Sequence, residues 1–298
     1  MAGRKRFRLR LASRTLVLGD RTLVMGVVNV TPDSFFDGGK YADAQSAVAW
    51  SLELERSGAD LIDIGGQSTR PGASPVHTQE EMDRILPVIE GLHGQLKIPI
   101  SVDTQKSEVA EAALRAGAEI INDVSALRTD ARLAEVARHH RAPIALMHMR
   151  RNPATMQKAP FARDVMRDVI GGLKEAVARA TKSGIKKSMI LLDPGFGFGK
   201  RYEQNYELLA RLPEIAALGF PVVTGTSRKS FIGKALGHGN NPWPIEKRLW
   251  GTAATVTAEI IGGAHIVRVH DVAEMVQVAR VADEIVANSA NDAQKRAK

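Results

Sequence analysis

Apolar and polar positions follow two alternating periods along this chain. Short apolar runs rich in β-branched residues, typical of buried strands, are separated by longer stretches with apolar residues at helical spacing. The strand-like runs cover residues 23–30, 61–64, 98–102, 119–122, 143–147, 189–192, 221–224 and 264–269. The helical stretches cover residues 42–57, 78–94, 106–116, 131–140, 161–183, 203–212, 245–261 and 271–287. Nearly every predicted strand is therefore followed by a predicted helix.

Eight successive strand–helix units predict an α/β fold, a single closed (β/α)8 TIM barrel. An open doubly wound sheet is the alternative, but no clear Gly-x-Gly-x-x-Gly follows the first strand. Before the barrel, residues 7–23 alternate around Gly19 and Asp20, which predicts an N-terminal β-hairpin. The predicted organisation is a basic arm and hairpin at 1–22, the barrel at 23–289 and a basic tail at 290–298.

Composition restricts the class of protein. Hydrophobic residues make up 44% and charged residues 25% of the chain, which is ordinary for a globular protein with a sizeable core. The chain has no cysteine, which excludes disulfides and cysteine nucleophiles and fits a cytoplasmic protein. Charges interrupt every apolar stretch, so no membrane partner is expected. Much of the net charge of +8 lies at the two ends, which we interpret as basic termini rather than a nucleic-acid-binding surface.

Polar residues stand where the predicted strands end, and in a (β/α)8 barrel the chemistry lies at those carboxyl ends. The polar side chains there belong to Asn29, Asp63, Asp103, Thr104, Asn122, Asp123, His148, Asp193, Arg268 and His270. Any one of the Asp and Asn residues could be only a helix cap or a turn residue. Together they predict one rim of acceptors and amide donors, suited to the edge of a flat, nitrogen-rich heterocycle.

The most informative stretch runs from residue 222 to residue 234. A β-branched strand is expected to end at Gly225, and a helix is expected to begin after Ser230. Backbone N–H groups at a helix start favour an anion, and Arg228 and Lys229 add positive charge. The turn therefore predicts a site for phosphate or pyrophosphate, with a solvated basic turn as the alternative. Nearby acidic groups are expected to favour the charged form of Lys229.

Two further features suggest a chemistry. Glycine-rich segments with aromatic residues, around 35–36 and 196–198, predict lids that exclude water. Asn29 and Asp103 offer oxygen ligands for a magnesium ion that keeps most of its waters. From the residues alone, we predict a barrel enzyme that handles the pyrophosphate ester of a planar polar heterocycle.

The chain resembles the dihydropteroate synthase family, the pterin-binding barrel enzymes of the folate pathway. Eight motifs carry the resemblance: GVVNVTPDSFFDGG (26–39), IDIGGQSTRPG (62–72), ISVDT (100–104), IND (121–123), LMHM (146–149), LDPGFGFGK (192–200), SRKS (227–230) and RVH (268–270). In this family the second motif usually has Glu where this chain has Gln67. Glutamine keeps the size and one acceptor but loses the charge, which affects the hydrogen bonding beneath that loop rather than the reaction.

The resemblance implies that para-aminobenzoate displaces pyrophosphate from 6-hydroxymethyl-7,8-dihydropterin pyrophosphate, giving 7,8-dihydropteroate. It implies a pterin site of Asp63, Asp103, Asn122, Met147, Asp193, Gly225 and Lys229. It implies a pyrophosphate site of Asn29, Thr69, Arg70, Arg268 and His270, with Mg²⁺ held by Asn29 and Asp103. Para-aminobenzoate would lie against Phe35, Thr69, Pro71, Phe198 and Ser230. The catalytic roles would fall to Asp37, Asp103, Lys229 and Arg268, in a dissociative mechanism in which pyrophosphate leaves before the amine attacks.

Two other classes stay open at this point. A pterin-binding methyltransferase on the same barrel would need the pterin groups but not the 227–230 turn or the 35–37 loop. A non-catalytic pterin-binding paralogue is kept open by Gln67. The resemblance also implies a homodimer whose only other partners are its small-molecule substrates.

Overall fold

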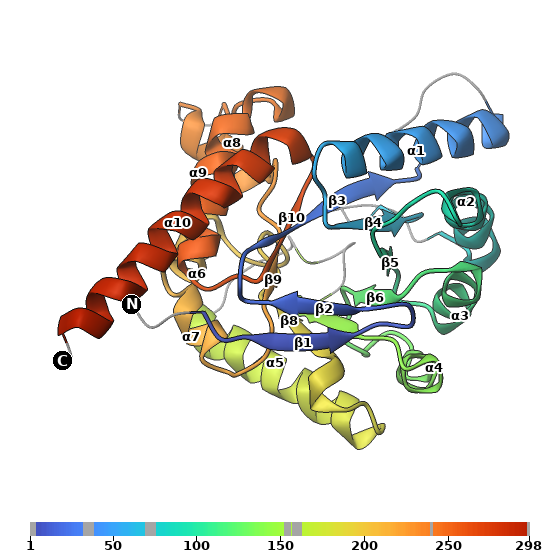
Figure 1. The fold of residues 1–298 in the computed structure, drawn as a ribbon, viewed down its shortest axis with the longest axis horizontal. Helices are drawn as coiled ribbons and strands as arrows, with labels where there is room; N and C mark the ends of the chain where they lie inside the picture. Colours follow the sequence, from blue (N-terminus) through green and yellow to red (C-terminus); the bar gives the residue numbers. More distant parts are fainter. Residues whose placement is uncertain are drawn as a thin grey trace.

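Eight parallel strands form the centre of the molecule and curl into a barrel (Figure 1). The computed structural model describes the backbone of residues 4–31, 39–68, 76–151, 156, 163–238 and 241–296. The barrel strands are β3 (Leu23–Asn29), β4 (Leu61–Gly65), β5 (Ile100–Asp103), β6 (Ile120–Asp123), β7 (Ile144–Met147), β8 (Ile190–Asp193), β9 (Val223–Thr224) and β10 (Ile266–Val269). They pair in the order β8-β7-β6-β5-β4-β3-β10-β9, and a parallel bridge between Leu192 and Val222 joins the two ends. The predicted barrel is confirmed.

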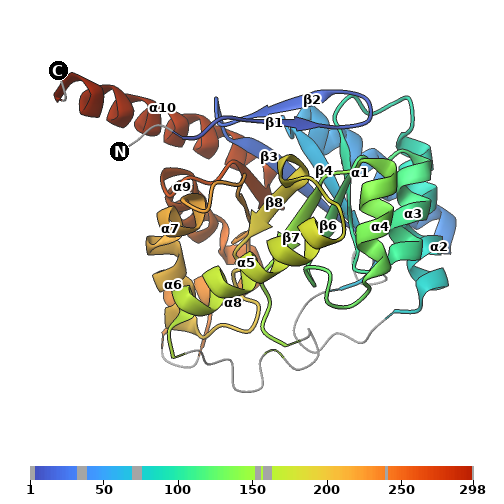
Figure 2. The ribbon, with the colours of Figure 1, turned by 90° about the horizontal axis from the view of Figure 1, so that it is seen from below.

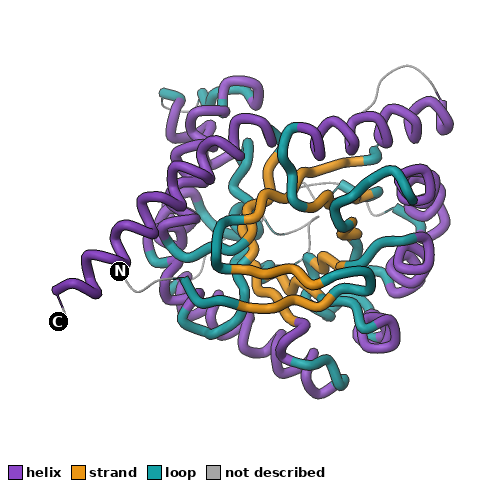
Figure 3. The backbone as a smooth tube through the Cα atoms, viewed as in Figure 1, coloured by secondary structure: helices purple, strands orange, loops and turns teal. Residues whose placement is uncertain are grey.

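Helices surround the strands on the outside of the barrel (Figure 3). They are α1 (Gly39–Arg56), α2 (Thr78–Leu92), α3 (Ser107–Ala116), α4 (Arg132–His140), α5 (Val165–Lys182), α6 (Tyr202–Ala210), α7 (Leu212–Ala216), α8 (Ser230–Leu236), α9 (Leu249–Ile261) and α10 (Val272–Arg296). None of these described helices is long and apolar enough to cross a membrane.

Some predicted helix boundaries are wrong. The helix expected at 203–212 ends at Ala210, and the separate helix α7 begins at Leu212 with Pro213, which has no N–H to donate, in its first turn. The helix expected from 245 begins at Leu249, after a 3₁₀ turn at Ile245–Lys247. At the other end of the chain, α10 continues past the predicted end at 287.

The N-terminal hairpin is present, but its turn is not where the sequence pattern placed it. Strands β1 (Phe7–Arg10) and β2 (Thr15–Leu18) are antiparallel, and the backbone N–H of Leu11 donates to the carbonyl of Arg14 at 2.8 Å. Gly19 instead lies in the link to β3, with a φ of 102°. A Cβ there would lie 2.5 Å from the carbonyl oxygen of Lys5, so this link requires glycine.

The hairpin lies along one end of the barrel (Figure 2). Its buried leucines pack against residues at the start of the barrel strands. This cluster contains Leu9, Leu11, Leu18, Leu23, Met25, Leu61, Ile120, Ala145, Leu191, Val223 and Ile266. The hairpin therefore covers the amino-terminal end of the barrel with apolar side chains, which leaves the carboxyl end for chemistry.

Strand register brings the predicted polar residues to one level at that carboxyl end. Gly65 pairs with Asn29 on one side and with Asp103 on the other. Asp103 in turn pairs with Asn122, so four adjacent strands contribute at the same height. The polar residues Asn29, Asp103 and Asn122 are thus carried to one level of the rim, as expected.

Candidate active site

An arginine joins two carboxylates at the barrel mouth. Arg268, on β10, places Nε 2.6 Å from Oδ2 of Asp63 and Nη2 3.1 Å from Oδ2 of Asp103. Asn122 also donates from Nδ2 to Oδ2 of Asp63, at 3.0 Å. Four of the predicted site residues are therefore in one hydrogen-bonded group that spans the barrel. Burial, with the neighbouring carboxylate of Asp63, raises the pKa of Asp103 to about 7, against the opposing charge of Arg268.

Asp63 has an unused acceptor. The residue is fully buried, and its Oδ1 has no hydrogen-bond partner among the described residues. A buried acceptor without a donor costs free energy, so such atoms in native proteins usually receive a ligand or water proton. Asp63 is thus suited to accept a hydrogen bond from a bound molecule.

Lys229 immediately precedes α8 and lies against the segment that follows β8. Its Nζ donates to the carbonyl oxygen of Phe196 and lies 4.7 Å from the centroid of the Phe198 ring. Burial lowers the pKa of Lys229 to about 8, although the carboxylate of Asp193 opposes this shift. The prediction that nearby acids would dominate is therefore wrong in direction, because desolvation is the larger effect. With a pKa near 8, the lysine is still mostly charged at neutral pH.

The glycine-rich segment after β8 is fastened to its surroundings. Gly195 has a φ of 68°, and a Cβ there would lie 2.0 Å from the carbonyl oxygen of His148. The buried ammonium of Lys200 donates to the carbonyls of Gly195 at 2.7 Å and Phe198 at 3.2 Å. Phe196 is fully buried and packs near Phe231. The prediction of a lid is therefore wrong for Phe196, which belongs to the core.

Phe198 and Met147 make an apolar wall beside the polar group. Met147, Val124, Met149 and Met156 form a buried cluster, and Phe198 packs against it. Asp193 is buried at the end of β8 and accepts a hydrogen bond from the backbone N–H of Gly195 at 2.7 Å. A flat ring could therefore contact an apolar surface on its face and polar groups at its edge.

The basic turn at 226–230 offers less unpaired positive charge to a ligand than its sequence suggests. Arg228 binds Asp271 through both Nε and Nη2, so its charge is paired on the outer side of the turn. Ser227 Oγ lies 3.0 Å from Nδ1 of His270 and also accepts from the backbone N–H of His270 at 3.2 Å. The predicted phosphate site at this turn is thus wrong for Arg228. Ser230 is exposed as the first residue of α8, which has only seven residues.

Gly225 precedes this turn and lies against Arg268. A Cβ on Gly225 would meet the Cβ of Arg268 at 3.4 Å. The absence of a side chain therefore leaves space over the guanidinium stem, where a planar ligand could approach.

The two predicted magnesium ligands lie on either side of Gly65. Asn29 and Asp103 both pair with that glycine in the sheet, and the glycine has no side chain between them. Their oxygens are of the kind that Mg²⁺ prefers. Within the described part of the chain, no group of three His, Asp or Glu residues is arranged to hold a metal. The residues fit a magnesium ion that takes few protein ligands and completes its shell with water and phosphate oxygens.

A large cavity of about 1090 Å³ lies between the carboxyl end of β7 and α5. Several arginines line it, but some of their side chains already bind other groups of the protein. Arg128 donates to the carbonyl of Met149, Arg179 donates to that of Ala126, and Arg150 lies 3.2 Å from Asp168. Of the residues predicted at the strand ends, Met147 and His148 line it. Asp63, Asp103, Asn122 and Arg268 do not line it, so the cavity is distinct from the polar group at the barrel mouth.

Five predicted site residues cannot be placed. Phe35, Asp37, Thr69, Arg70 and Pro71 lie outside the described residues.

Two lysines with no role predicted from the sequence also hold segments of the rim. Lys200 anchors the glycine-rich segment, and Lys106 binds groups on both sides of the connection that follows β4. One signal for Lys106 was available, since a cation at the start of a helix opposes the helix dipole and requires a partner.

Comparisons with known proteins identify the family and agree with the barrel fold. The family model described as "Pterin binding enzyme" matches residues 25–270. The chain is 48% identical over 267 residues to the dihydropteroate synthase of Synechocystis sp., covering 90% of this chain and 91% of that one. A solved Xanthomonas albilineans dihydropteroate synthase with 4-aminobenzoic acid is 46% identical, with a TM-score of 0.87, and the match covers 94% of this chain and 98% of that one. A second structure from that organism, in complex with 7,8-dihydropteroate, is 44% identical with a TM-score of 0.83, covering 93% and 98%.

Proposed function

The chain belongs to the pterin-binding enzymes and, among them, to the dihydropteroate synthases, which are transferases, and from this premise we propose how its barrel rim performs the reaction. The enzyme joins 6-hydroxymethyl-7,8-dihydropterin pyrophosphate to para-aminobenzoate and releases pyrophosphate. One observation carries the proposal. Arg268 connects Asp63 and Asp103 at the carboxyl end of the barrel, so an anion-binding group and ring-binding acceptors share one site.

We propose that the pterin ring lies among Asp63, Asp103, Asn122, Asp193 and Lys229. The ring offers amino and N–H donors, which suit carboxylate acceptors, and ring N and O acceptors, which suit Asn122 and Lys229. The unused Oδ1 of Asp63 supports this placement, because a ring donor would satisfy it. Met147 would pack on one face of the ring, and Gly225 would allow the ring to approach Arg268.

We propose that pyrophosphate binds Arg268, His270 and Asn29, together with Thr69 and Arg70 from outside the described residues. A guanidinium has five N–H donors, and Arg268 uses those of Nε and Nη2 to bind the carboxylates of Asp63 and Asp103. Held by those carboxylates, its planar fork is oriented in advance for phosphate oxygens. A magnesium ion bound by Asn29 and Asp103 would neutralise charge on the leaving pyrophosphate.

We propose that para-aminobenzoate lies against Phe198 and Ser230, with Phe35, Thr69 and Pro71 contributing from outside the described residues. The Phe198 ring lies between the buried methionine cluster and the ammonium of Lys229. Its apolar face suits the benzene ring of the substrate, while the exposed Ser230 can donate to the carboxylate.

The reaction then needs no protein nucleophile. The bond between the pterin methylene carbon and the pyrophosphate oxygen breaks, and its electron pair leaves with pyrophosphate, which Arg268 stabilises. The resulting pterin cation is stabilised by the carboxylates of Asp103 and Asp193. The amine of para-aminobenzoate forms the new C–N bond, and its proton passes to solvent. Lys229 orients the ring, and Asp37, outside the described residues, would help shield the cation from water.

Pyrophosphate release tests this function. Purified enzyme is given both substrates with magnesium, and pyrophosphate and dihydropteroate are measured. Release of one pyrophosphate per dihydropteroate, dependent on para-aminobenzoate, is expected. Binding of pterin pyrophosphate without release of pyrophosphate would indicate a non-catalytic binding protein. Methyl transfer from methyltetrahydrofolate would indicate the methyltransferase alternative.

We also propose that the enzyme is a cytoplasmic homodimer that associates through α9 and α10. Trp250 on α9 is 78% exposed, and Val281 and Ile285, one turn apart on the adjacent helix α10, are 65% and 45% exposed. Exposed large apolar side chains on packed neighbouring helices are typical of a subunit interface. Sedimentation should therefore give a dimer, and Trp250→Lys with Val281→Lys should give a monomer. A monomeric wild type would contradict the proposal.

A further inference from the structure

A nearly buried ion pair lies beside the carboxyl end of β4. Nζ of Lys106 is 2.6 Å from Oε2 of Glu81, and the glutamate side chain is only 1% exposed. Glu81 belongs to the first turn of α2, and Lys106 immediately precedes α3. Withdrawing two charges from water is costly, so a pair of this kind needs further hydrogen bonds to be tolerated.

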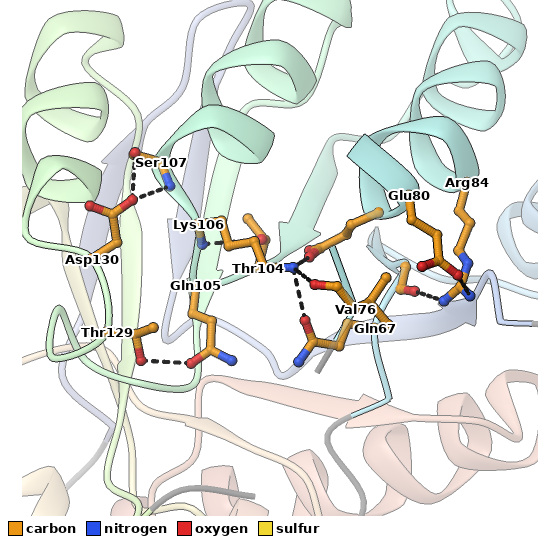
Figure 4. Close-up of polar contacts among 12 residues, drawn as sticks. Gln67, Val76, Glu80, Arg84, Thr104, Gln105, Lys106, Ser107, Thr129 and Asp130 are labelled. Atoms are coloured by element: carbon orange, nitrogen blue, oxygen red, sulfur yellow. Dashed lines mark hydrogen bonds and ion pairs between the residues drawn. The ribbon is translucent and has the colours of Figure 1, made fainter. Parts of the chain in front are cut away.

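Lys106 makes those further bonds to the two ends of one connection (Figure 4). Its Nζ donates to Oε1 of Gln67 at 3.1 Å and to the carbonyl oxygen of Val76 at 2.5 Å. An ammonium has three N–H donors, and Gln67, Val76 and Glu81 account for all three. Gln67 follows β4 and Val76 precedes α2, so the lysine links the exit of the β4–α2 connection to its return.

The backbone beside Gln67 is fixed as well. Arg84 donates from Nη1 to the carbonyl of Gly66 at 2.7 Å. A Cβ on Gly66 would lie 2.8 Å from the side chain of Ile85 and 3.0 Å from the carbonyl oxygen of Glu81. The backbone at Gly66, where the connection leaves β4, therefore packs closely against α2. Lys106 links this end of the connection to Val76, where the connection reaches α2.

The same short segment reaches the active site. Lys106 lies three residues after Asp103, which binds Arg268 at the barrel mouth. Its backbone N–H donates to Oγ1 of Thr104 at 3.3 Å, which holds the intervening turn. A displacement of Lys106 would therefore affect both the β4–α2 connection and the chain that carries Asp103.

We propose that Lys106 is a positioning residue of the synthase reaction, which sets where the β4–α2 connection leaves and rejoins the barrel rim. The inference rests on the proposed function, since that connection carries the residues assigned to pyrophosphate and para-aminobenzoate. Gln67 is the weaker arm of the link, because a neutral amide oxygen accepts a less strong hydrogen bond from an ammonium than a carboxylate does.

The test replaces the ion pair by apolar side chains of similar length. Lys106→Met with Glu81→Met avoids leaving a buried carboxylate unpaired, so the double variant is expected to fold. The KM for para-aminobenzoate should rise at least about tenfold, whereas the affinity for pterin pyrophosphate should change less than about threefold. Hydrogen exchange should accelerate in peptides that contain Gln67 and Val76 and stay unchanged in α10.

A matched control is an exposed pair on α3. Arg115 and Glu111 are 2.5 Å apart with side chains 71% and 40% exposed, so Arg115→Met with Glu111→Met should leave both KM values and the exchange unchanged. Should the buried double variant not fold, Lys106→Arg decides the question. It keeps the charge beside Glu81, but a planar fork cannot serve three diverging acceptors, so the same rise in KM is expected.

The outcomes separate this inference from the proposed function. A folded double variant with wild-type KM values overturns the positioning role, and so does faster exchange with unchanged KM. If the wild type makes no dihydropteroate, the proposed function fails, while the exchange experiment still tests the link. Gln67→Glu provides a test in the opposite direction: slower exchange around Val76 is expected, and unchanged exchange would contradict the weaker-arm assignment.

Discussion

Arg268 and Asp103 face each other across the mouth of the barrel, with Nη2 3.1 Å from Oδ2. The same guanidinium binds the fully buried Asp63, so one cation balances two carboxylates. This contact connects the proposed pyrophosphate site to the proposed pterin site. Loss of the arginine should therefore affect both the fold and the chemistry.

Arg268→Met should lower the free energy of unfolding by on the order of 3 kcal/mol, because the buried carboxylates lose their cation. Adding Asp63→Asn and Asp103→Asn should restore much of this loss without restoring turnover. Denaturant unfolding and pyrophosphate release measure the two effects separately. A wild-type unfolding midpoint for Arg268→Met would show that the cation does not stabilise the buried pair.

Asp193→Ala and Asp193→Asn should both weaken binding of pterin pyrophosphate by at least about tenfold, because a buried charged acceptor is lost. Asparagine retains an acceptor for the N–H of Gly195, so it separates the loss of charge from a local rearrangement. Calorimetric titration provides the measurement, with thermal unfolding as the check on folding. Wild-type affinity in both variants would remove Asp193 from the pterin site.

Lys229→Ala should abolish most activity, and Lys229→Arg should be nearly as damaging, because a planar fork does not replace a compact ammonium. Borohydride added during turnover should trap no adduct, since no carbonyl substrate takes part. An adduct on Lys229 would instead indicate a Schiff-base mechanism.

Activity should also fall as the pH rises through about 8, the pKa to which burial lowers Lys229, because the pterin then loses a charged donor. The pH profile of kcat/KM for pterin pyrophosphate measures this loss. A profile that stays level up to pH 10 would show that the proton on Lys229 is not needed.

We expect the buried carboxyl group of Glu259 to make the free energy of unfolding depend on pH. This residue of α9 is fully buried, and neither carboxylate oxygen has a hydrogen bond of good geometry within the described chain. Burial raises its pKa from 4.5 to about 8, against the opposing charge of Lys229. The folded state thus holds a proton that the unfolded state releases above pH 4.5, and the associated stability is lost as pH rises towards 8.

Glu259→Gln removes this titration. The stability of the variant relative to the wild type should therefore increase by about 4 kcal/mol between pH 4.5 and pH 8. Urea unfolding at several pH values provides the measurement, and Glu53→Gln on the exposed face of α1 is the control. A constant difference between Glu259→Gln and the wild type would show that Glu259 is ionised throughout.

Local sequence patterns were sufficient to predict the barrel fold and many of the polar residues at its carboxyl end. Strand and helix periods depend on which positions are apolar, and residues such as Asp63, Asp103 and Asn122 mark strand ends directly. A parallel (β/α)8 barrel gathers all strand ends on one face, so their convergence follows from the topology.

The direction of individual side chains was decided only by the tertiary structure. Arg228 and Lys229 are adjacent cations, and the sequence assigned both to one anion site. Arg228 has a φ of 58° and pairs with Asp271, whereas Lys229 meets the carbonyl of Phe196. Arg228 and Lys229 point to different partners because of the backbone conformation at Arg228 and because its charge partner lies far along the chain. Neither feature can be recognised in the local sequence.

The depth to which each side chain is buried was likewise decided only by the tertiary structure. The sequence places acids near Lys229 but does not show how deeply its ammonium is enclosed, so the direction of its pKa shift was mispredicted. The hairpin turn was misplaced because the packing of Leu9 and Leu18 against the barrel end, rather than Gly19 and Asp20, sets the strand register. The sequence by itself determined the elements, their order and the chemistry at the strand ends. Charge partners, desolvation and the link through Lys106 required contacts between segments that only the folded chain brings together.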